Sequence, residues 1–246
     1  MEFGGLTAVN EFSLALTPGE LVGLIGPNGA GKTTVFNMIT GSLVPTRGKV
    51  LFDGHDITGR KAHQITARGI ARTFQNIRLF NDLTVFENLM VSFHFQTKSS
   101  FLGAVFRLPR YRRETEAARS MASHLLEEVG LQELTWEKAG ALAYGQQRRL
   151  EIARALATRP KLILLDEPAA GMNPRETEAL MDLIQKIRRD YNLTVLLIEH
   201  DMTFVMGICE RLKVLDYGIT IAEGLPEEIQ NNERVIQAYL GERRFA

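Results

Sequence analysis

Leu21-Val22-Gly23-Leu24-Ile25 runs directly into Gly26-Pro27-Asn28-Gly29-Ala30-Gly31-Lys32-Thr33, and this stretch decides the fold. Its second part fits the pattern G-x-x-x-x-G-K-[S/T] in full, an apolar strand precedes it, and residues 34–40 can continue as a helix. Glycines let consecutive backbone N–H groups converge on phosphate oxygens, and a helix N-terminus adds positive potential. The stretch therefore predicts a loop that binds the phosphates of a nucleotide.

Side chains of this loop have distinct expected contacts. Lys32 supplies a positive charge for the β and γ phosphates of ATP, and the Thr33 hydroxyl is a suitable ligand for Mg²⁺. The residues expected to bind the nucleotide here are Gly26, Pro27, Asn28, Gly29, Ala30, Gly31, Lys32, Thr33 and Thr34.

Two acidic residues follow a second apolar run. Leu162–Leu165 reads as a buried strand and leads into Asp166-Glu167-Pro168. A carboxylate at a strand end beside a phosphate loop can hold Mg²⁺ directly or through water, which is the expectation for Asp166. Glu167 points elsewhere and can polarise the attacking water as a general base. ATP and Mg²⁺ are thus the predicted ligands.

Further runs of strand length indicate an α/β fold. Thr194–Ile198 is continuously apolar and follows a polar helical stretch, as 162–165 does, which is typical of a mainly parallel sheet covered on both faces. Lys49–Phe52 predicts a strand closed by a turn at Asp53-Gly54. Lys213–Leu215 and Ile219–Ala222 predict a late antiparallel hairpin.

The middle of the chain has few strand signals. In Glu114–Val129, four apolar residues recur four positions apart, which predicts a helix with one buried stripe: Ala117, Met121, Leu125 and Val129. We expect a helical subdomain over residues 76–158, inserted into an α/β core formed by residues 1–75 and 159–246. The stretch Ser99–Arg113 mixes apolar and basic residues, and it fits a short helix packed on this subdomain better than a membrane-surface patch.

Composition excludes several classes of protein. Lys and Arg total 29 and Asp and Glu total 29, so the formal net charge is zero, which argues against a dedicated duplex-DNA binder. The single cysteine, Cys209, cannot form an internal disulfide, which favours a reducing compartment. No apolar run is long enough to span a bilayer, and the first residues do not resemble a signal peptide.

One further segment narrows the family. Leu142-Ala143-Tyr144-Gly145-Gln146-Gln147-Arg148-Arg149-Leu150 resembles the Leu-Ser-Gly-Gly-Gln signature of ATP-binding-cassette (ABC) ATPases, which is followed by a helix. Three other features agree in order: Gln75, the loop Ala169–Asn173, and His200 just after the 194–198 strand. The resemblance covers essentially the whole chain and implies a P-loop NTPase fold with a mainly parallel core sheet, an antiparallel β part and an inserted α-helical subdomain.

The resemblance implies roles for these residues. Gln75 would sense Mg²⁺ and the attacking water, and His200 would contact the γ-phosphate. Phe3 would stack on adenine, with Val9 lining the same face. In this family two cassettes face each other head to tail, so the signature would meet the γ-phosphate of ATP bound to a second subunit. The signature residues concerned are Ala143, Tyr144, Gly145 and Gln146, with Gly145 expected to open the helix.

The chain departs from the family pattern in places. Ala143 replaces the usual serine and Tyr144 the first glycine of the signature, while Asn173 replaces an aspartate in the loop after Glu167. The chain also begins almost at Phe3, where relatives have a short strand before this aromatic. Either this sheet edge is missing or the true start lies upstream.

Details of the signature, of the loop up to Asn173-Pro174, and of residues 238–242 look like an ATP-binding subunit of bacterial branched-chain amino-acid importers. That resemblance implies a second ATPase subunit, identical or different, two membrane permeases and a periplasmic binding protein, with no nucleic acid. It implies a peripheral place on the cytoplasmic face of the inner membrane. The alternatives are an ATPase for lipopolysaccharide export or urea uptake, a soluble ABC ATPase of DNA repair or translation, and a small P-loop kinase.

Overall fold

The computed structural model describes residues 1–94 and 109–242, and the chain divides into two compact units. Unit 1 comprises Met1–Gln75 and Lys161–Ala246, and unit 2 comprises Asn76–Pro160. The insertion expected over residues 76–158 overlaps unit 2 and ends slightly before it. In the two described ranges, no helix is both long enough and apolar enough to cross a bilayer.

Unit 1 is built on a six-stranded sheet with the order β10-β9-β3-β8-β7-β6. Neighbouring strands are parallel except for the pair β9 and β10, which is antiparallel. This confirms the α/β fold with a mainly parallel core sheet and an antiparallel part. The strands are β3 (Leu21–Ile25), β6 (Ile70–Arg72), β7 (Leu162–Asp166), β8 (Thr194–Ile198), β9 (Arg211–Asp216) and β10 (Ile219–Gly224).

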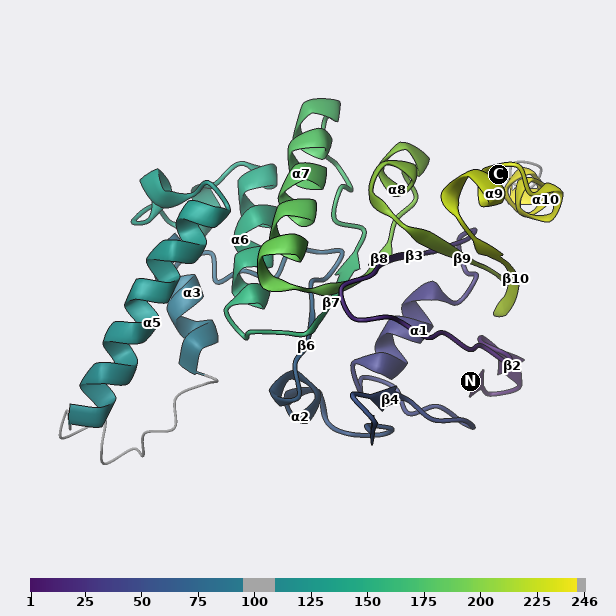
Figure 1. Ribbon diagram of the computed structural model, residues 1–246, viewed down its shortest axis with the longest axis horizontal. Coiled ribbons are helices and arrows are strands. Elements are labelled where there is room, and N and C mark those ends of the chain that lie inside the picture. The colour runs from purple at the N-terminus through teal and green to yellow at the C-terminus, as the bar shows by residue number, and fades with distance from the viewer. Residues whose placement is uncertain (95–108, 243–246) are drawn as a thin grey trace. The chain divides into compact units, whose positions relative to one another are not determined.

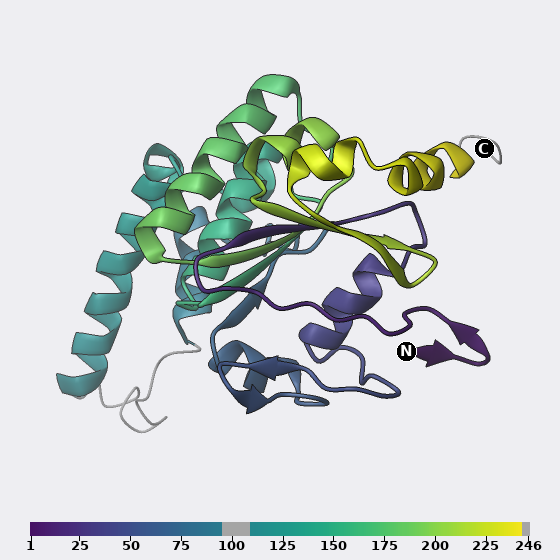
Figure 2. The same ribbon diagram turned by 45° about the vertical axis from the view of Figure 1, so that its right-hand side comes forward.

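Helices cover both faces of this sheet, which is why β3, β7 and β8 are buried along their whole length. Helix α1 (Lys32–Ile39) lies on one face, and α7 (Pro174–Tyr191) and α8 (Met202–Ile208) lie on the other (Figures 1 and 2). These strands are apolar at nearly every residue because both of their faces are buried, so they lack the alternation of polar and apolar residues seen in strands with one exposed face.

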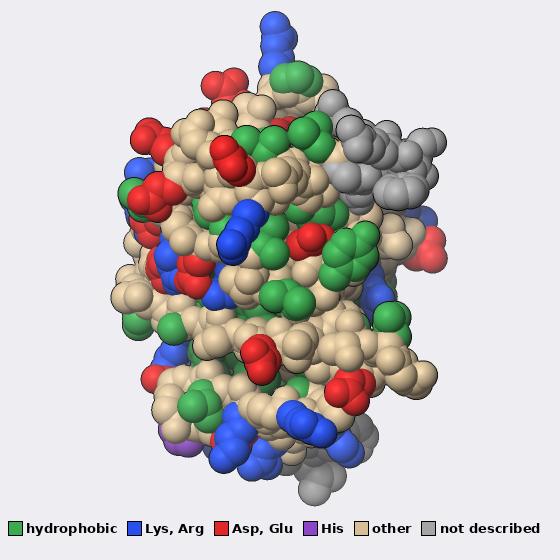
Figure 3. Space-filling view, turned by 90° about the vertical axis from the view of Figure 1, so that its right-hand side faces the viewer, with side chains coloured by type: hydrophobic (Ala, Val, Ile, Leu, Met, Phe, Trp, Pro, Cys, Tyr) green, Lys and Arg blue, Asp and Glu red, His purple; other side chains and the backbone are tan. Residues whose placement is uncertain are grey.

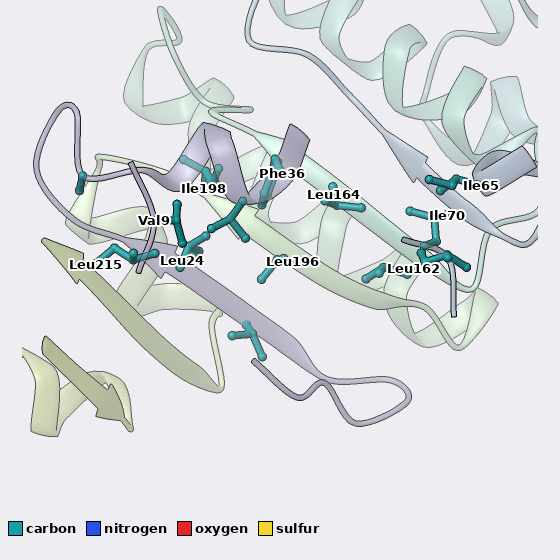
Figure 4. Close-up of a cluster of buried hydrophobic side chains, with 14 residues drawn as sticks. Val9, Leu24, Phe36, Ile65, Ile70, Leu162, Leu164, Leu196, Ile198 and Leu215 are labelled. Carbon is teal, nitrogen blue, oxygen red and sulfur yellow. The ribbon is translucent and has the colours of Figure 1, made fainter. Parts of the chain in front are cut away.

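Side chains alternate along β3 between these two layers. Leu24 belongs to the cluster that includes Phe36 of α1 (Figure 4). Gly23 faces the opposite layer: a Cβ there would lie 2.7 Å from Leu212 and 3.0 Å from the sulfur of Cys209, which follows α8. Burial against this layer raises the pKa of the Cys209 thiol to about 12.

The described residues of unit 1 form three β-hairpins. The strand expected over Lys49–Phe52 is shorter than predicted: β4 (Leu51–Phe52) pairs only with β5 (His55–Asp56), around the expected turn at residues 53–54. The predicted hairpin of β9 and β10 is confirmed, and Tyr217 and Gly218 at its turn both have positive φ. At the N-terminus, β1 (Glu2–Phe3) pairs with β2 (Leu6–Thr7).

Short helices complete this unit: α2 (Ala62–Ala67), α9 (Pro226–Gln230) and α10 (Glu233–Glu242). On the side where β2, β10 and α10 lie, hydrophobic side chains reach the surface at several separate places between charged ones (Figure 3). Tyr217, Leu225 and Leu240 are among the exposed large hydrophobic residues of this part of the chain.

Unit 2 is helical, with α3 (Val85–His94), α5 (Pro109–Glu128), α6 (Tyr144–Leu156) and two short 3₁₀ turns at Gln132–Leu134 and Ala139–Ala141. Helix α3 packs against α5 and α6. The expected helix over 114–129 is confirmed and begins earlier than predicted. Of the stretch 99–113, residues 99–108 lie outside the described ranges, and 109–113 form the first part of α5.

The predicted buried stripe of α5 is partly wrong. Leu125 and Val129 are buried, but Ala117 is exposed and Met121 is only half-buried. Each step of four residues rotates about 40° beyond a full turn of the helix, so a strict four-residue spacing drifts off the packed face. Ala122 and Leu126 take the expected places instead.

Candidate functional site

The carboxyl ends of four parallel strands meet at one edge of the sheet in unit 1. Strand β3 leads into Gly26, β6 ends at Arg72, β7 leads into Glu167 and β8 leads into Glu199. Ligands of open α/β sheets bind outside this edge. The topology therefore brings the phosphate loop and both predicted acidic residues together.

The phosphate loop has a backbone that only glycine can adopt at key points. Gly26 has φ 147°, and a Cβ there would lie 1.9 Å from the carbonyl oxygen of Leu215. Gly31 has φ 102°, and its Cβ would lie 2.5 Å from the carbonyl oxygen of Ala8. Gly31 also stands at the N-cap of α1, so no side chain caps this helix end, and its first turn carries no acidic residue. This end of α1 suits a bound anion.

Lys32 is oriented by the loop itself. Its ammonium donates hydrogen bonds to the carbonyl oxygens of Gly26, at 2.6 Å, and Pro27, at 2.8 Å, and the residue is buried. Thr33, the next residue, is exposed at the helix start. A fixed cation, an uncapped helix end and an exposed hydroxyl form a set that fits a Mg²⁺-bound triphosphate.

Asp166 ends β7 and is almost fully buried. Its Oδ2 accepts a hydrogen bond of 2.6 Å from Nη2 of Arg72, an ion pair in which both side chains are less than a tenth exposed. The hydroxyl of Thr33, the carboxylate of Asp166 and the amide oxygen of Gln75 are oxygen donors of the kind that Mg²⁺ prefers. The expected metal ligands are therefore chemically suitable.

Glu167 lies between two side chains that the sequence also singled out. Nε2 of Gln75 donates to its Oε2 at 2.6 Å, and Nε2 of His200 lies 2.6 Å from its Oε1. Its backbone has φ 47°, rare for a residue with a side chain, and its N–H donates to the carbonyl oxygen of Ile198. The turn after β7 thus holds the carboxylate in one place.

Glu199 was not predicted to matter, yet it organises this loop. The buried carboxylate accepts hydrogen bonds from the backbone N–H groups of Ala169, His200 and Asp201. It thereby links the loop after Glu167 to the loop that carries His200. The available signal was its position as the first residue after the apolar 194–198 run, the place that Asp166 and Glu167 occupy around β7.

Comparison with known proteins decides the family. The family described as "ABC transporter" matches residues 9–170, which is most of the chain. This chain belongs to the ATP-binding cassette (ABC) family. A second family, described as "Branched-chain amino acid ATP-binding cassette transporter", matches residues 220–244 of the cassette.

Individual relatives agree over nearly the whole cassette. It is 52% identical to the high-affinity branched-chain amino acid transport ATP-binding protein BraF of Pseudomonas aeruginosa, covering 98% of this chain and 95% of that one. It is 39% identical to the lipopolysaccharide export system ATP-binding protein LptB of Haemophilus influenzae, covering 96% and 91%. Its fold is similar to the crystal structure of MJ1267, an ATP-binding cassette of an ABC transporter, in the ADP conformation, with a TM-score of 0.85, 33% identity and coverage of 98% and 95%.

The signature segment of the cassette lies in unit 2. Helix α6 begins at Tyr144, one residue before the predicted Gly145, and Ala143 is its N-cap. Ala143 has no side-chain acceptor, and Oε1 of Gln146 instead accepts the Ala143 N–H at 3.0 Å. Tyr144 is exposed, with its hydroxyl 3.3 Å from Nη2 of the buried Arg148.

Two residues of the cassette that were expected near adenine differ in exposure. Phe3 is 44% exposed on β1, as a stacking surface requires. Val9 is 4% exposed and belongs to the core cluster with Ala30, and its Cγ2 would lie 3.1 Å from a Cβ on Gly31, so it packs against the phosphate loop. Asn173, the third departure from the family pattern, is the N-cap of α7, where its amide oxygen accepts the Glu176 N–H at 3.1 Å.

Proposed function

We propose that this ABC ATPase binds Mg²⁺-ATP at the carboxyl edge of the unit 1 sheet. The backbone of residues 26–34 and the ammonium of Lys32 would hold the phosphates, and Phe3 would stack on adenine. Thr33, Asp166 and Gln75 would hold Mg²⁺, which neutralises the charge that develops on the phosphate oxygens. The support is the uncapped start of α1, the oriented lysine and the oxygen donors around it.

Hydrolysis would use Glu167 as the general base. The carboxylate takes a proton from the water that attacks the γ-phosphorus, while the bond between that phosphorus and the bridging oxygen breaks. Gln75 and His200 hold its two oxygens, so it does not have to reorganise during the reaction. The γ-phosphate contact that the family resemblance implies for His200 would be made from this same loop after β8. This three-residue arrangement is the observation that carries the chemistry.

The signature of unit 2 would complete the site of another subunit. The first turn of α6 presents backbone N–H groups and no acidic side chain, and an anion is stabilised at such an end. The γ-phosphate of ATP bound to a partner cassette, identical or different, would be that anion. Closure of the pair would then depend on ATP, and hydrolysis would reopen it.

The transport system is inferred from the comparisons. BraF and the C-terminal family match at residues 220–244 both point to branched-chain amino-acid import, and the lipopolysaccharide-export relative is more distant. We therefore place the chain on the cytoplasmic face of the inner membrane, with two permeases and a periplasmic binding protein as partners.

Uptake measurements test this role. In the source organism, replacing the chain by its Lys32→Ala variant should abolish high-affinity uptake of labelled leucine, isoleucine and valine, because ATP binding is lost. Uptake of labelled proline serves as the control. Normal leucine uptake together with a defect in surface lipopolysaccharide would reject amino-acid import in favour of export.

A further inference from the structure

Arg72 makes an unusual set of contacts at the metal side of the site. It ends β6, and its guanidinium is buried, with Nη2 on Oδ2 of Asp166 at 2.6 Å. Its other terminal nitrogen, Nη1, donates to Oδ1 of Asn37 at 2.7 Å and to the Thr40 hydroxyl at 3.4 Å. One planar group therefore joins the end of β7 to the C-terminal half of α1 and its C-cap.

The partners of Arg72 on α1 lie on the same face of the helix as an expected metal ligand. Thr33, Asn37 and Thr40 are spaced by four and three residues, so they lie along one face of the helix. Arg72 thus binds Asp166 with one nitrogen and the helix face that carries Thr33 with the other. Thr33 and Asp166 are two of the three residues expected to hold Mg²⁺, and Gln75 is the third.

Two aromatic rings restrict the guanidinium further. Its central carbon lies 5.5 Å from the ring centre of Phe36 and 5.0 Å from that of Phe74, within the range of cation–π contacts. A buried ion pair gives little net stability compared with a well-packed apolar pair. Stability alone therefore does not account for a charged, forked group in this place.

We propose that Arg72 is a positioning residue for the metal site, and that it sets the separation of Thr33 and Asp166 by binding Asp166 and Asn37 at once. This rests on the metal site of the proposed function and extends it to a residue that does not touch the metal. Only a planar fork with two donors reaches both partners, so the role requires arginine and not only a positive charge. Because Arg72 holds Oδ2, the other carboxylate oxygen of Asp166 would be the one to bind the metal.

The test measures how strongly Mg²⁺ improves ATP binding. A fluorescent ATP analogue is titrated into the full chain in EDTA and at a series of Mg²⁺ concentrations. For Arg72→Met, the Mg²⁺ concentration that half-saturates this improvement should rise by about 10–100-fold, as for other groups that orient metal ligands, while affinity in EDTA stays unchanged. Arg72→Lys should remain well short of the parental response.

Matched variants separate positioning from folding. Arg188→Met removes a partly buried guanidinium that holds Glu210 and the carbonyl oxygen of Gly19. These two residues precede β9 and β3, whereas Asp166 lies at the carboxyl end of β7, so the Mg²⁺ response should be unchanged. Asn37→Ala removes the other partner of Arg72 and should also raise the Mg²⁺ concentration that half-saturates the improvement in ATP binding. This second variant tests the inference if Arg72→Met does not fold.

Three results would overturn the inference. An unchanged or tighter Mg²⁺ response in both Arg72→Met and Asn37→Ala would show that the bridge does not position the ligands. Full rescue by Arg72→Lys would show that charge alone suffices. If Mg²⁺ does not change ATP binding even in the parental protein, the metal site of the proposed function is refuted. That result is distinct from failure of the Arg72 inference alone, in which only the variants lack the expected change.

Discussion

Glu167 combines backbone strain with a fixed side chain. A left-handed backbone costs roughly 1–2 kcal/mol for a residue with a Cβ, and Glu167 adopts it with φ 47°. The hydrogen bonds of Gln75 and His200 to its carboxylate, and of its N–H to Ile198, hold it there. Such strain at the end of a strand is consistent with a site in which position matters more than local stability.

We expect Glu167→Gln to stop hydrolysis without stopping ATP binding. The amide keeps the size of the side chain but cannot accept a proton, and the loss of a general base slows the chemical step by about 10²–10⁴-fold. Steady-state phosphate release and a nucleotide titration measure the two effects. Glu178→Gln, on the exposed surface of α7, is the control that should keep the parental rate. A fully active Glu167→Gln variant would remove Glu167 from the proposed role.

Cys209 should be unreactive while the protein is folded. Burial raises the pKa of its thiol to about 12, so at about pH 8 almost none of it is the reactive thiolate, and the side chain is also shielded from reagents. Because the chain has a single cysteine, a colorimetric thiol reagent reports on this residue alone. Labelling should be absent in buffer and complete in guanidinium chloride. Rapid labelling of the folded protein would contradict the packing of α8 against β3.

At the scale of elements, the phosphate loop offers a matched pair of glycines. Gly26 and Gly29 both have positive φ, but a Cβ at Gly26 would overlap the carbonyl oxygen of Leu215, whereas nothing lies within 4 Å of one at Gly29. Gly29→Ala should cost about 1–2 kcal/mol of unfolding free energy from backbone strain alone. Gly26→Ala should cost clearly more, because β9 must also move. Urea denaturation of both variants measures the difference, and equal losses would argue against the close approach of the loop to β9.

The elements differ in how well their sequences predicted them. Strands β3 and β8 match their predicted ranges because each is a continuous apolar run between polar boundaries. The first residues of α5 were missed because their apolar spacing is poor, and its stripe was misplaced because a period of 3.6 was approximated by four. Local sequence patterns therefore predicted the bounds of elements that are buried along their whole length, such as β3 and β8. They were less successful for α5, which is buried on one side only.

The candidate site shows the complementary limit. The phosphate loop, Asp166 and Glu167 each lie within a local motif that can be read from the sequence. Arg72 and Glu199 have no such motif, since their partners are 94 residues away for Arg72 and Asp166, and 30 away for Glu199 and Ala169. Only the pairing of β6, β7 and β8 brings them together, and sheet order is not encoded in any one segment.

At the scale of the whole molecule, the proposed mechanism divides one site between two subunits. The phosphate loop, Asp166 and Glu167 belong to unit 1, and the signature residues around Gly145 belong to unit 2. If each site uses unit 1 of one subunit and unit 2 of its partner, defects in the two units must complement each other. This is a consequence that a site contained within one chain does not share.

Lys32→Ala and Gly145→Asp provide the two defects. The first removes the cation of the phosphate loop. The second places a negative charge at the start of α6, where an acidic side chain favours the helix but repels a phosphate.

Each variant alone, assayed with the parental partner chain absent, should be nearly inactive. A mixture should recover ATPase activity if the native pair contains two copies of this chain. In each mixed pair, one of the two sites combines the intact Lys32 of one chain with the intact Gly145 of the other. The recovered rate should rise with protein concentration, as assembly requires. If the native pair instead contains a companion ATPase, the mixture stays inactive, and adding that companion to parental chain should accelerate hydrolysis. Parental activity that is fast, unaffected by dilution and unchanged by a companion would contradict the shared site.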